Sequence, residues 1–282
     1  MSDQKVLLSL GHGYSARALG RLLLSEGWQV IGTSREPAAP EGAATEIIRW
    51  PGSDLRRAME AASHMLVSIA PTAEGDPVLS SLAREIAAAA PRLEWVGYLS
   101  TTAVYGDHGG GWVDEETPLA PTTERGRWRV AAEAAWQELA RESGLPLHIF
   151  RLAGIYGPGR GPFAKLRAGK ARRIIKPGQV FSRIHVEDLA RVLKASMENP
   201  RPGAIYNVCD DKPAPPQDVI AKAADLLGLP VPPAEDFASA EMSPMARHFY
   251  AESKRVRNER MKRELGVELL YPDYESGLAS LL

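Results

Sequence analysis

The sequence predicts a doubly wound parallel α/β sheet with a small, mostly helical C-terminal lid. Over the first two hundred residues, short apolar runs of β type alternate with longer helical patterns, as in repeated βαβ units. Several of these runs are apolar on both faces, as expected of strands that helices cover on both sides. A glycine-rich turn follows the first run and opens the first helical pattern.

The elements follow one another at spacings that suit right-handed crossovers. The expected strands are Lys5–Leu10, Trp28–Thr33, Glu46–Trp50, His64–Ile69, Leu93–Ser100, Pro146–Leu152 and Ile205–Val208. The expected helices are Ser15–Glu26, Asp54–Ala62, Pro77–Ala90, Glu124–Ser143 and Val186–Glu198.

The alternation breaks after the sixth strand, at the glycine- and proline-rich stretch Gly154–Gly161. We therefore expect residues 154–179 and 211–282 to form the lid, and residues 1–153 and 180–210 to form the sheet domain. A chain of 282 residues is long for one core and short for two, which favours a core with a smaller appendage.

Composition argues against several classes of function. The formal net charge is −1 and the basic residues are scattered, so we expect no binding to nucleic acid or to an acidic membrane. The single cysteine, Cys209, allows no internal disulfide, and no group of His, Cys, Asp and Glu has the spacing of a metal site. The polar N-terminus lacks the apolar run of a signal peptide, which predicts a cytoplasmic protein.

The glycine-rich turn fits the dinucleotide-binding pattern G-x-G-x-x-G/A, with the residues Gly11, His12, Gly13, Tyr14, Ser15 and Ala16. The hexapeptide alone is weak, but here it lies between an apolar strand and an amphipathic helix, as the pattern requires. Gly11 permits the tight turn, Gly13 lets a pyrophosphate approach the backbone, and Ala16 lets the helix pack on the strand. The free N–H groups at the helix start would hold the anion. The alternative is a βα turn without a ligand.

The end of the second strand bears on the choice between NAD and NADP. It carries Thr33, Ser34 and Arg35 where NAD-binding proteins usually place an acid for the ribose 2′-hydroxyl. Hydroxyls beside a guanidinium fork suit a 2′-phosphate, so the sequence favours NADP over NAD. Two alternatives stay open: Glu36 could hold an NAD ribose if the strand ends later, and Arg35 could be a solvated side chain.

Over nearly its whole length the chain resembles the extended short-chain dehydrogenase/reductase family, of the NAD-dependent epimerase/dehydratase type. The blocks that carry the resemblance are the glycine-rich turn, Ser68 to Pro71, Leu99 to Asp107, Asp114 to Pro118, Arg151 to Gly159, Arg183 to Leu189 and Tyr206 to Val208. The resemblance implies a Rossmann domain whose cofactor site includes Ile69, Ala70 and Pro71, and a small-molecule substrate. It also implies a homodimer that pairs through the helices Pro77–Ala90 and Glu124–Ser143.

The chain departs from the family at the catalytic pair. In the family, a Ser or Thr after the fifth strand orients the substrate, and a Tyr-x-x-x-Lys pair on the next helix exchanges the proton. Thr101 matches the hydroxyl position, but Arg125 and Arg129 stand where the Tyr and the Lys belong. A guanidinium stays protonated, so Arg125 cannot accept a proton, whereas Arg129 could still hydrogen-bond the nicotinamide ribose. The resemblance is thus to atypical members that keep the cofactor fold and lose this pair.

Two tyrosines, Tyr105 and Tyr156, follow strand ends where doubly wound folds place their ligands. Each is a candidate for a replacement proton donor, and the alternative is that it packs the crevice or touches substrate without proton transfer. His108 is expected to be an exposed loop histidine, and Arg160 could meet an anionic substrate.

Two functions stay open from the sequence. One is an oxidoreductase or epimerase that acts on a carbonyl or sugar-like substrate with Thr101 and a non-standard proton donor, which the complete family scaffold favours. The other is a non-catalytic NAD(P)-binding protein that senses redox state or regulates a partner, which Arg125 and Arg129 favour. Fold alone does not decide between them.

Overall fold

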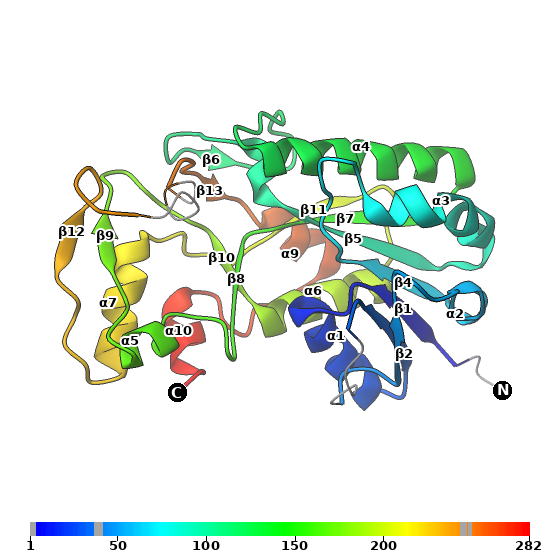
Figure 1. Ribbon diagram of the computed structural model, residues 1–282, viewed down its shortest axis with the longest axis horizontal. Coiled ribbons are helices and arrows are strands. Elements are labelled where there is room, and N and C mark those ends of the chain that lie inside the picture. The colour runs from blue at the N-terminus through cyan, green and yellow to red at the C-terminus, as the bar shows by residue number, and fades with distance from the viewer. Residues whose placement is uncertain (1–3, 37–41, 243–246, 248–249) are drawn as a thin grey trace.

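A seven-stranded parallel sheet forms the centre of the computed structural model, which describes residues 4–36, 42–242, 247 and 250–282. The strand order is β11-β7-β5-β4-β1-β2-β3 (Figure 1). The strands are β1 (Val6–Leu10), β2 (Gln29–Ser34), β3 (Glu46–Arg49), β4 (His64–Val67), β5 (Trp95–Thr101), β7 (Leu147–Leu152) and β11 (Ile205–Val208). The order reverses between β1 and β4, which is where such sheets open a ligand-binding crevice. The predicted fold class is confirmed.

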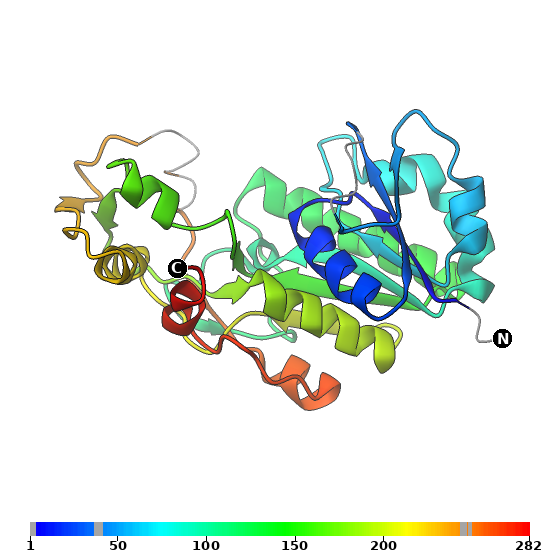
Figure 2. The same cartoon turned by 90° about the horizontal axis from the view of Figure 1, so that it is seen from below.

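Helices cover both faces of the sheet (Figures 1 and 2). On one face lie α1 (Tyr14–Ser25) and α6 (Val186–Glu198), and on the other lie α2 (Arg56–Ala61), α3 (Pro77–Ala89) and α4 (Glu124–Ser143). Successive residues of β1 enter opposite cores, because Leu7 packs with α1 and α6 whereas Leu8 packs with α2 and α3. The continuous apolar runs in the sequence therefore reflect burial on both faces.

The expected elements of the sheet domain are confirmed, with ends that shift by two residues or fewer. Specific caps explain some of the boundaries. Asp76 precedes α3, and its Oδ1 accepts hydrogen bonds from the N–H groups of Val78 and Leu79 at 2.9 and 3.1 Å. Gly144 ends α4 in the left-handed conformation, with φ at +71°. Two short 3₁₀ turns complete this part, η1 (Ala90–Arg92) and η2 (Thr102–Tyr105).

The lid has a small core of its own beside the sheet domain (Figures 1 and 2). It contains α5 (Phe163–Arg167), α7 (Pro216–Leu226), α10 (Tyr274–Ala279) and the parallel strands β9 (Arg173–Ile175) and β12 (Ala234–Asp236). A second parallel pair, β8 (Gly154–Tyr156) with β10 (Arg183–His185), lies where the lid joins the sheet domain. These strands have three residues each, too few to leave an alternating pattern in the sequence, and the expectation of a mostly helical lid missed them.

The C-terminal segment does not follow the expected division into two parts. The helix α9 (Glu259–Leu265) packs against α6 and β11, and Met261, Leu265 and Val267 lie in the same core as the sheet. Just before it, β13 (Arg255–Val256) pairs with β6 (Trp112–Val113). Residues 255–269, which we expected in the lid, therefore belong with the sheet domain because their apolar side chains are buried there. In the described part of the chain, no helix is long and apolar enough to cross a membrane.

Candidate cofactor-binding site

The turn of residues 11–16, here called the phosphate turn, is held by both neighbouring strands. The N–H of Gly11 donates to Oγ1 of Thr33 on β2 at 2.9 Å, and Oγ of Ser68, just after β4, donates to the carbonyl oxygen of Gly11. Gly11 has φ at +88°, and a Cβ there would lie 2.6 Å from Cγ1 of Ile69. Only glycine fits this conformation and this space. Ser68 was part of a sequence block, but its role could not be seen without the fold.

The front of the phosphate turn is open. A Cβ on Gly13 would meet no atom within 4 Å, whereas Ala16 is fully buried where α1 packs on the sheet. The helix begins with no side-chain cap and no acidic residue in its first turn. Its first N–H groups and its positive dipole end therefore suit an anion. Tyr14 and Ser15 are half-buried at the first two positions of the helix.

The side chain of His12 points away from this opening. Its Nε2 lies 2.8 Å from the carbonyl oxygen of Ala43, and its ring fills the space beside Gly32, where a Cβ would come within 2.6 Å. Burial lowers the pKa of His12. The imidazole therefore packs between α1 and β2, and only the backbone of this expected site residue can face a cofactor.

The three residues expected to select NADP lie in different environments. Thr33 is buried, and its hydroxyl is occupied by Gly11. Ser34 is half-buried and donates to the carbonyl oxygen of Glu36 at 2.9 Å, while the side chains of Arg35 and Glu36 are exposed. Arg49, which sequence reasoning missed, is exposed on β3 in register with Ser34. Arg35 and Arg49 thus lie at the ends of neighbouring strands. The sequence does not show that they are close, because this depends on how β2 and β3 pair.

After β4, the expected residues Ile69, Ala70 and Pro71 border the phosphate turn in different ways. Ile69 lies under Gly11, Ala70 is exposed, and Pro71 is buried. Thr101, at the end of β5, is half-buried, and its Oγ1 accepts a hydrogen bond from the N–H of Ala103 at 3.2 Å. That bond occupies an acceptor site and leaves the hydroxyl proton available.

Tyr105 lies in the core and not in the crevice. Its side chain is fully buried, its hydroxyl donates to Oδ1 of Asn207 at 2.7 Å, and Nη1 of Arg151 donates to the same hydroxyl at 2.9 Å. Burial raises the pKa of Tyr105 to about 12. A buried phenol with both partners inside the protein has no route to a substrate, so its place supports the packing alternative.

Arg151 also forms a buried ion pair below the strand ends. Its Nη2 lies 2.8 Å from Oε2 of Glu133 on α4, and Oγ of Ser100 donates to the same carboxylate. Both charged side chains are less than 5% exposed. The polar side chains of Ser100 and Arg151, near the ends of β5 and β7, therefore hold α4 on the sheet.

Tyr156 also serves packing. It is buried, and its hydroxyl lies 3.4 Å from the carbonyl oxygen of Asp273, which precedes α10. A Cβ on Gly277 would come within 1.9 Å of this hydroxyl, so α10 approaches the ring closely because residue 277 is glycine. Burial raises the pKa of Tyr156. Its position fits an anchor for the lid rather than a proton donor.

The two arginines on α4 differ in their surroundings. Arg125 is exposed. Arg129 is half-buried, and its Nη1 donates to the carbonyl oxygen of Leu99 at 2.8 Å and to the hydroxyl of Tyr98 at 2.9 Å. The guanidinium of Arg129 thus ties α4 to β5.

The polar residues at the start of α6 make structural hydrogen bonds, although the buried Nε2 of His185 has no hydrogen-bond partner among the described residues. Nδ1 of His185 accepts a hydrogen bond from the N–H of Glu187 at 3.3 Å, and the carboxylate of Asp188 accepts from Leu270 and Tyr271 at 2.7 and 3.0 Å. His108 is half-buried, with Nε2 3.1 Å from the carbonyl oxygen of Tyr105. Within the described ranges, no three His, Cys, Asp or Glu residues are placed to hold a metal ion.

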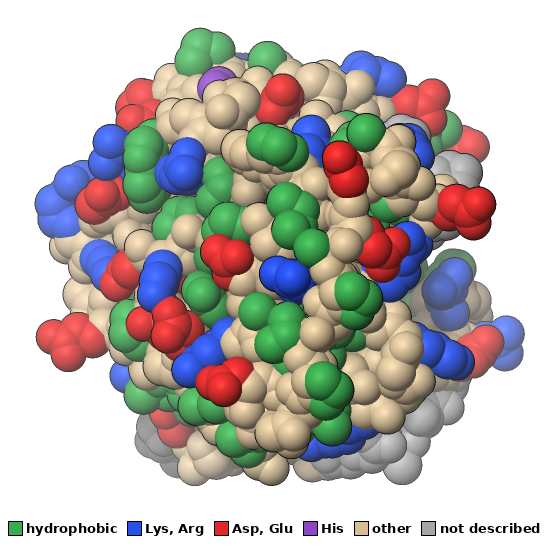
Figure 3. All heavy atoms as spheres, turned by 90° about the vertical axis from the view of Figure 1, so that its left-hand side faces the viewer, with side chains coloured by type: hydrophobic (Ala, Val, Ile, Leu, Met, Phe, Trp, Pro, Cys, Tyr) green, Lys and Arg blue, Asp and Glu red, His purple; other side chains and the backbone are tan. Residues whose placement is uncertain are grey.

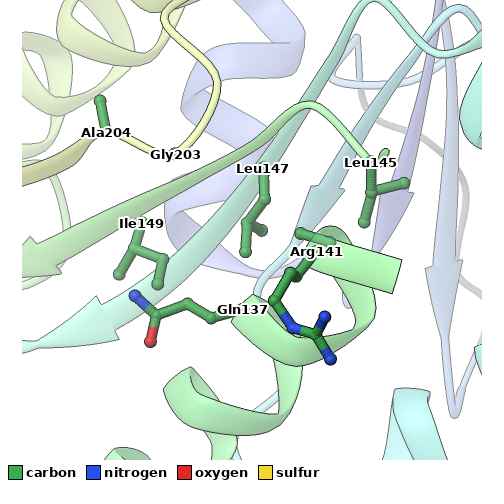
Figure 4. A pocket seen from close by; sticks show the side chains of 8 residues that line it. Gln137, Arg141, Leu145, Leu147, Ile149, Gly203 and Ala204 are labelled. Carbon is green, nitrogen blue, oxygen red and sulfur yellow. The ribbon is translucent and has the colours of Figure 1, made fainter. Parts of the chain in front are cut away.

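Two surface features lie apart from the phosphate turn. A depression of about 340 Å³ runs between α4 and the β7–β11 edge, lined by Gln137, Ala140, Arg141, Leu145, Leu147, Ile149, Gly203 and Ala204 (Figure 4). The lid face in Figure 3 mixes basic and acidic side chains. The basic stretch Arg167–Lys176 has acidic neighbours there, since Arg172 pairs with Glu235. Neither feature adds groups to the candidate site.

Comparisons with known proteins agree with this fold. The model of the family described as "NAD dependent epimerase/dehydratase family" matches residues 8–209. Protein YeeZ of Escherichia coli (strain K12) is 30% identical over 95% of this chain and 97% of its own length. A functionally unknown conserved protein from Silicibacter pomeroyi DSS has a solved structure with 61% identity and a TM-score of 0.93, covering 99% of this chain and 98% of that one.

A more distant structural match is an enzyme with its cofactor bound. UDP-glucuronic acid 4-epimerase from Bacillus cereus, in complex with NAD, superposes with a TM-score of 0.78 at 17% identity, over 97% of this chain and 96% of that one. At this identity the likeness concerns the fold.

Proposed function

This chain belongs to the NAD dependent epimerase/dehydratase family, and we propose that it binds NADP as a regulatory or redox-sensing ligand without the family's proton relay. One contrast carries the proposal. The phosphate turn keeps its shape and an open front, whereas the side chains considered as proton donors are buried in the core or replaced by arginine.

The proposed binding is supported by the hydrogen bonds that hold the phosphate turn in place. Hydrogen bonds from β2 and from the end of β4 fix Gly11 from two sides, and the uncapped start of α1 offers N–H groups to an anion. A site that is already shaped before the ligand arrives loses little conformational entropy on binding.

The preference for NADP is supported by two exposed guanidinium groups. Arg35 follows β2, and Arg49 ends β3 in register with Ser34. A ribose 2′-phosphate between these strand ends would receive charge-assisted hydrogen bonds from both arginines. Glu36 is exposed next to them. If the chain bound NAD instead, this carboxylate would accept hydrogen bonds from the ribose hydroxyls.

The absence of turnover by the usual route follows from the chemistry of α4. A guanidinium at position 125 cannot accept a proton, and the guanidinium of Arg129 donates hydrogen bonds to Leu99 and Tyr98. Loss of general acid–base catalysis lowers a rate by about 10²–10⁴-fold. The buried hydroxyls of Tyr105 and Tyr156 do not replace it.

A second candidate function is hydride transfer to a carbonyl with a proton taken from water. Thr101 favours it, because its hydroxyl stands at the end of β5 with its proton available. In that case the chain would be a slow oxidoreductase whose Thr101 orients the substrate.

Calorimetric titration with NADPH and NADH tests the proposed binding. We expect NADPH to bind at least about tenfold more tightly, and Arg35→Ala or Arg49→Ala to weaken NADPH about tenfold while leaving NADH unchanged. Arg56→Ala is the matched control, because Arg56 is also exposed but pairs with Asp54. Equal or tighter NADH binding that Arg35→Ala does not change would overturn the preference for NADP.

Turnover separates the two candidate functions. NADPH would be incubated with a panel of aldehydes, ketones and nucleotide sugars while its nicotinamide absorbance is followed. The proposed function predicts no oxidation above the buffer rate. Oxidation that Thr101→Ala abolishes would favour the oxidoreductase.

A further inference from the structure

A tight turn of the lid lies against the first residue of α1. The N–H groups of Gly157 and Arg160 each donate to the other residue's carbonyl oxygen at 2.9 Å. Pro158 and Gly159 fill the two central positions, and Gly159 has φ at +71°, as in a type II turn. The reciprocal bonds and the proline ring give the backbone of Arg160 a defined place.

This turn touches the phosphate turn through Tyr14. The hydroxyl of Tyr14 donates to the carbonyl oxygen of Pro158 at 3.0 Å, and Cζ of Arg160 lies 5.5 Å from the centre of the tyrosine ring. A Cβ on Gly157 would come within 2.7 Å of both the Tyr14 hydroxyl and Val186. Residue 157 must therefore be glycine for the lid to come this close to α1.

Arg160 brings a positive charge that is not already neutralised. Its side chain is exposed, and no carboxylate in the described part of the chain lies within ion-pair distance of it. Burial raises the pKa of Tyr14, and the nearby charge of Arg160 opposes that rise. The guanidinium thus acts on the first residue of α1, a helix with neither a side-chain cap nor an acid in its own first turn, although the carboxylate of Glu187 on α6 is also close enough to raise the pKa of Tyr14.

We infer that Arg160 binds the pyrophosphate of the cofactor, so that a residue of the lid completes the phosphate turn of the sheet domain. The guanidinium fork matches a phosphate in charge and in shape, and Tyr14 holds the lid turn at the entrance by its bond to Pro158. This inference rests on the proposed function, because it assigns a further residue to the same cofactor site.

The test compares Arg160→Gln with Arg167→Gln by titration with NADPH, inorganic pyrophosphate and adenosine 2′-monophosphate. Arg167 is the matched control, since it is also an exposed lid arginine over an aromatic ring, that of Phe163. Arg160→Gln should weaken NADPH and pyrophosphate about tenfold and leave adenosine 2′-monophosphate unchanged, because that probe has no pyrophosphate. Arg167→Gln should change none of the three.

The outcomes separate this inference from the proposed function. A wild-type protein that binds no nicotinamide nucleotide would overturn both. Normal NADPH binding that Arg160→Gln leaves within twofold would overturn the role of Arg160 alone. An equal loss in Arg167→Gln, or an equal loss for adenosine 2′-monophosphate, would also overturn it, because the effect would then come from general charge or from the adenosine end.

Discussion

The phosphate turn and the start of α4 lie at the same edge of one sheet, yet their polar groups are used in opposite ways. At the phosphate turn, the backbone of Gly11 donates to Thr33 and accepts from Ser68, and the front of the turn stays open. At α4, the side chains of Arg129, Arg151 and Glu133 bond one another or the strands. The difference teaches that polar groups at one edge of a sheet can either shape an open backbone turn or tie a helix to the strands.

The largest effect should come from closing the phosphate turn with Gly11→Val. A β-branched residue at a φ of +88°, with a Cβ 2.6 Å from Ile69, should abolish measurable NADPH binding and lower the free energy of unfolding by about 4 kcal/mol. Calorimetry and urea unfolding would measure the two effects. Gly27→Val is the control, because Gly27 has φ at +82° but open space, and it should lose stability without losing affinity. If Gly11→Val still bound NADPH, the phosphate turn would not be the cofactor site, and the contrast with α4 would be wrong.

A smaller effect should appear where the lid meets the sheet, at Asp210. Burial raises the pKa of its carboxyl to about 8, although the charge of Arg183 opposes that shift. The folded protein therefore holds a proton that the unfolded chain has released between about pH 4 and pH 8. The free energy of unfolding should therefore fall as the pH rises through this window, because the folded state holds a proton that the unfolded state has lost.

Asp210→Asn should remove this part of the pH dependence. Urea unfolding at pH 5 and pH 8.5 would measure it, with Asp211→Asn as the control, because the side chain of Asp211 is 40% exposed and pairs with Lys262. Parallel stability profiles for the wild type and Asp210→Asn would contradict the buried, protonated carboxyl. We expect the NADPH affinity of this variant to be unchanged. That result would mean that Asp210, at the junction of the lid and the sheet domain, affects stability and not cofactor binding.

Tyr105→Phe should sharpen the comparison at the end of β5. The variant removes the hydroxyl that Asn207 and Arg151 share and should cost about 1–2 kcal/mol of unfolding free energy. The NADPH dissociation constant should stay within twofold of the wild type. A tyrosine that served the cofactor would show the reverse, with affinity lost and the midpoint of urea unfolding unchanged.

The smallest effect should be that of Arg125→Ala. This side chain is exposed on α4, at the position where the sequence resemblance predicts a tyrosine, so its removal should change unfolding free energy by less than about 0.5 kcal/mol. Thermal unfolding and NADPH titration would both be measured. A clear loss of affinity would mean that residue 125 still contacts the cofactor, and the two regions would no longer be distinct.

The sequence predicted the sheet well because burial on both faces leaves continuous apolar runs, and because residues such as Asp76 and Gly144 mark helix ends. The phosphate turn could also be predicted from the sequence, because the conformation of the turn itself requires its glycines. The roles of Tyr105, Tyr156 and His12 were not predictable, because strand order decides whether a side chain after a strand faces the crevice or the core. The pairing of Arg49 with Ser34 depends on register, which leaves no local signal.

The path of the C-terminal segment has a mechanical consequence. The chain leaves the sheet domain at β8, returns at β10, leaves again after β11, and comes back for β13 and α9 before ending in α10 of the lid. With so many crossings, no single hinge residue could swing the lid open. Any opening must bend several connections together, as a small shear of packed surfaces. For the same reason, no one cut in the chain would release the lid as a separate piece.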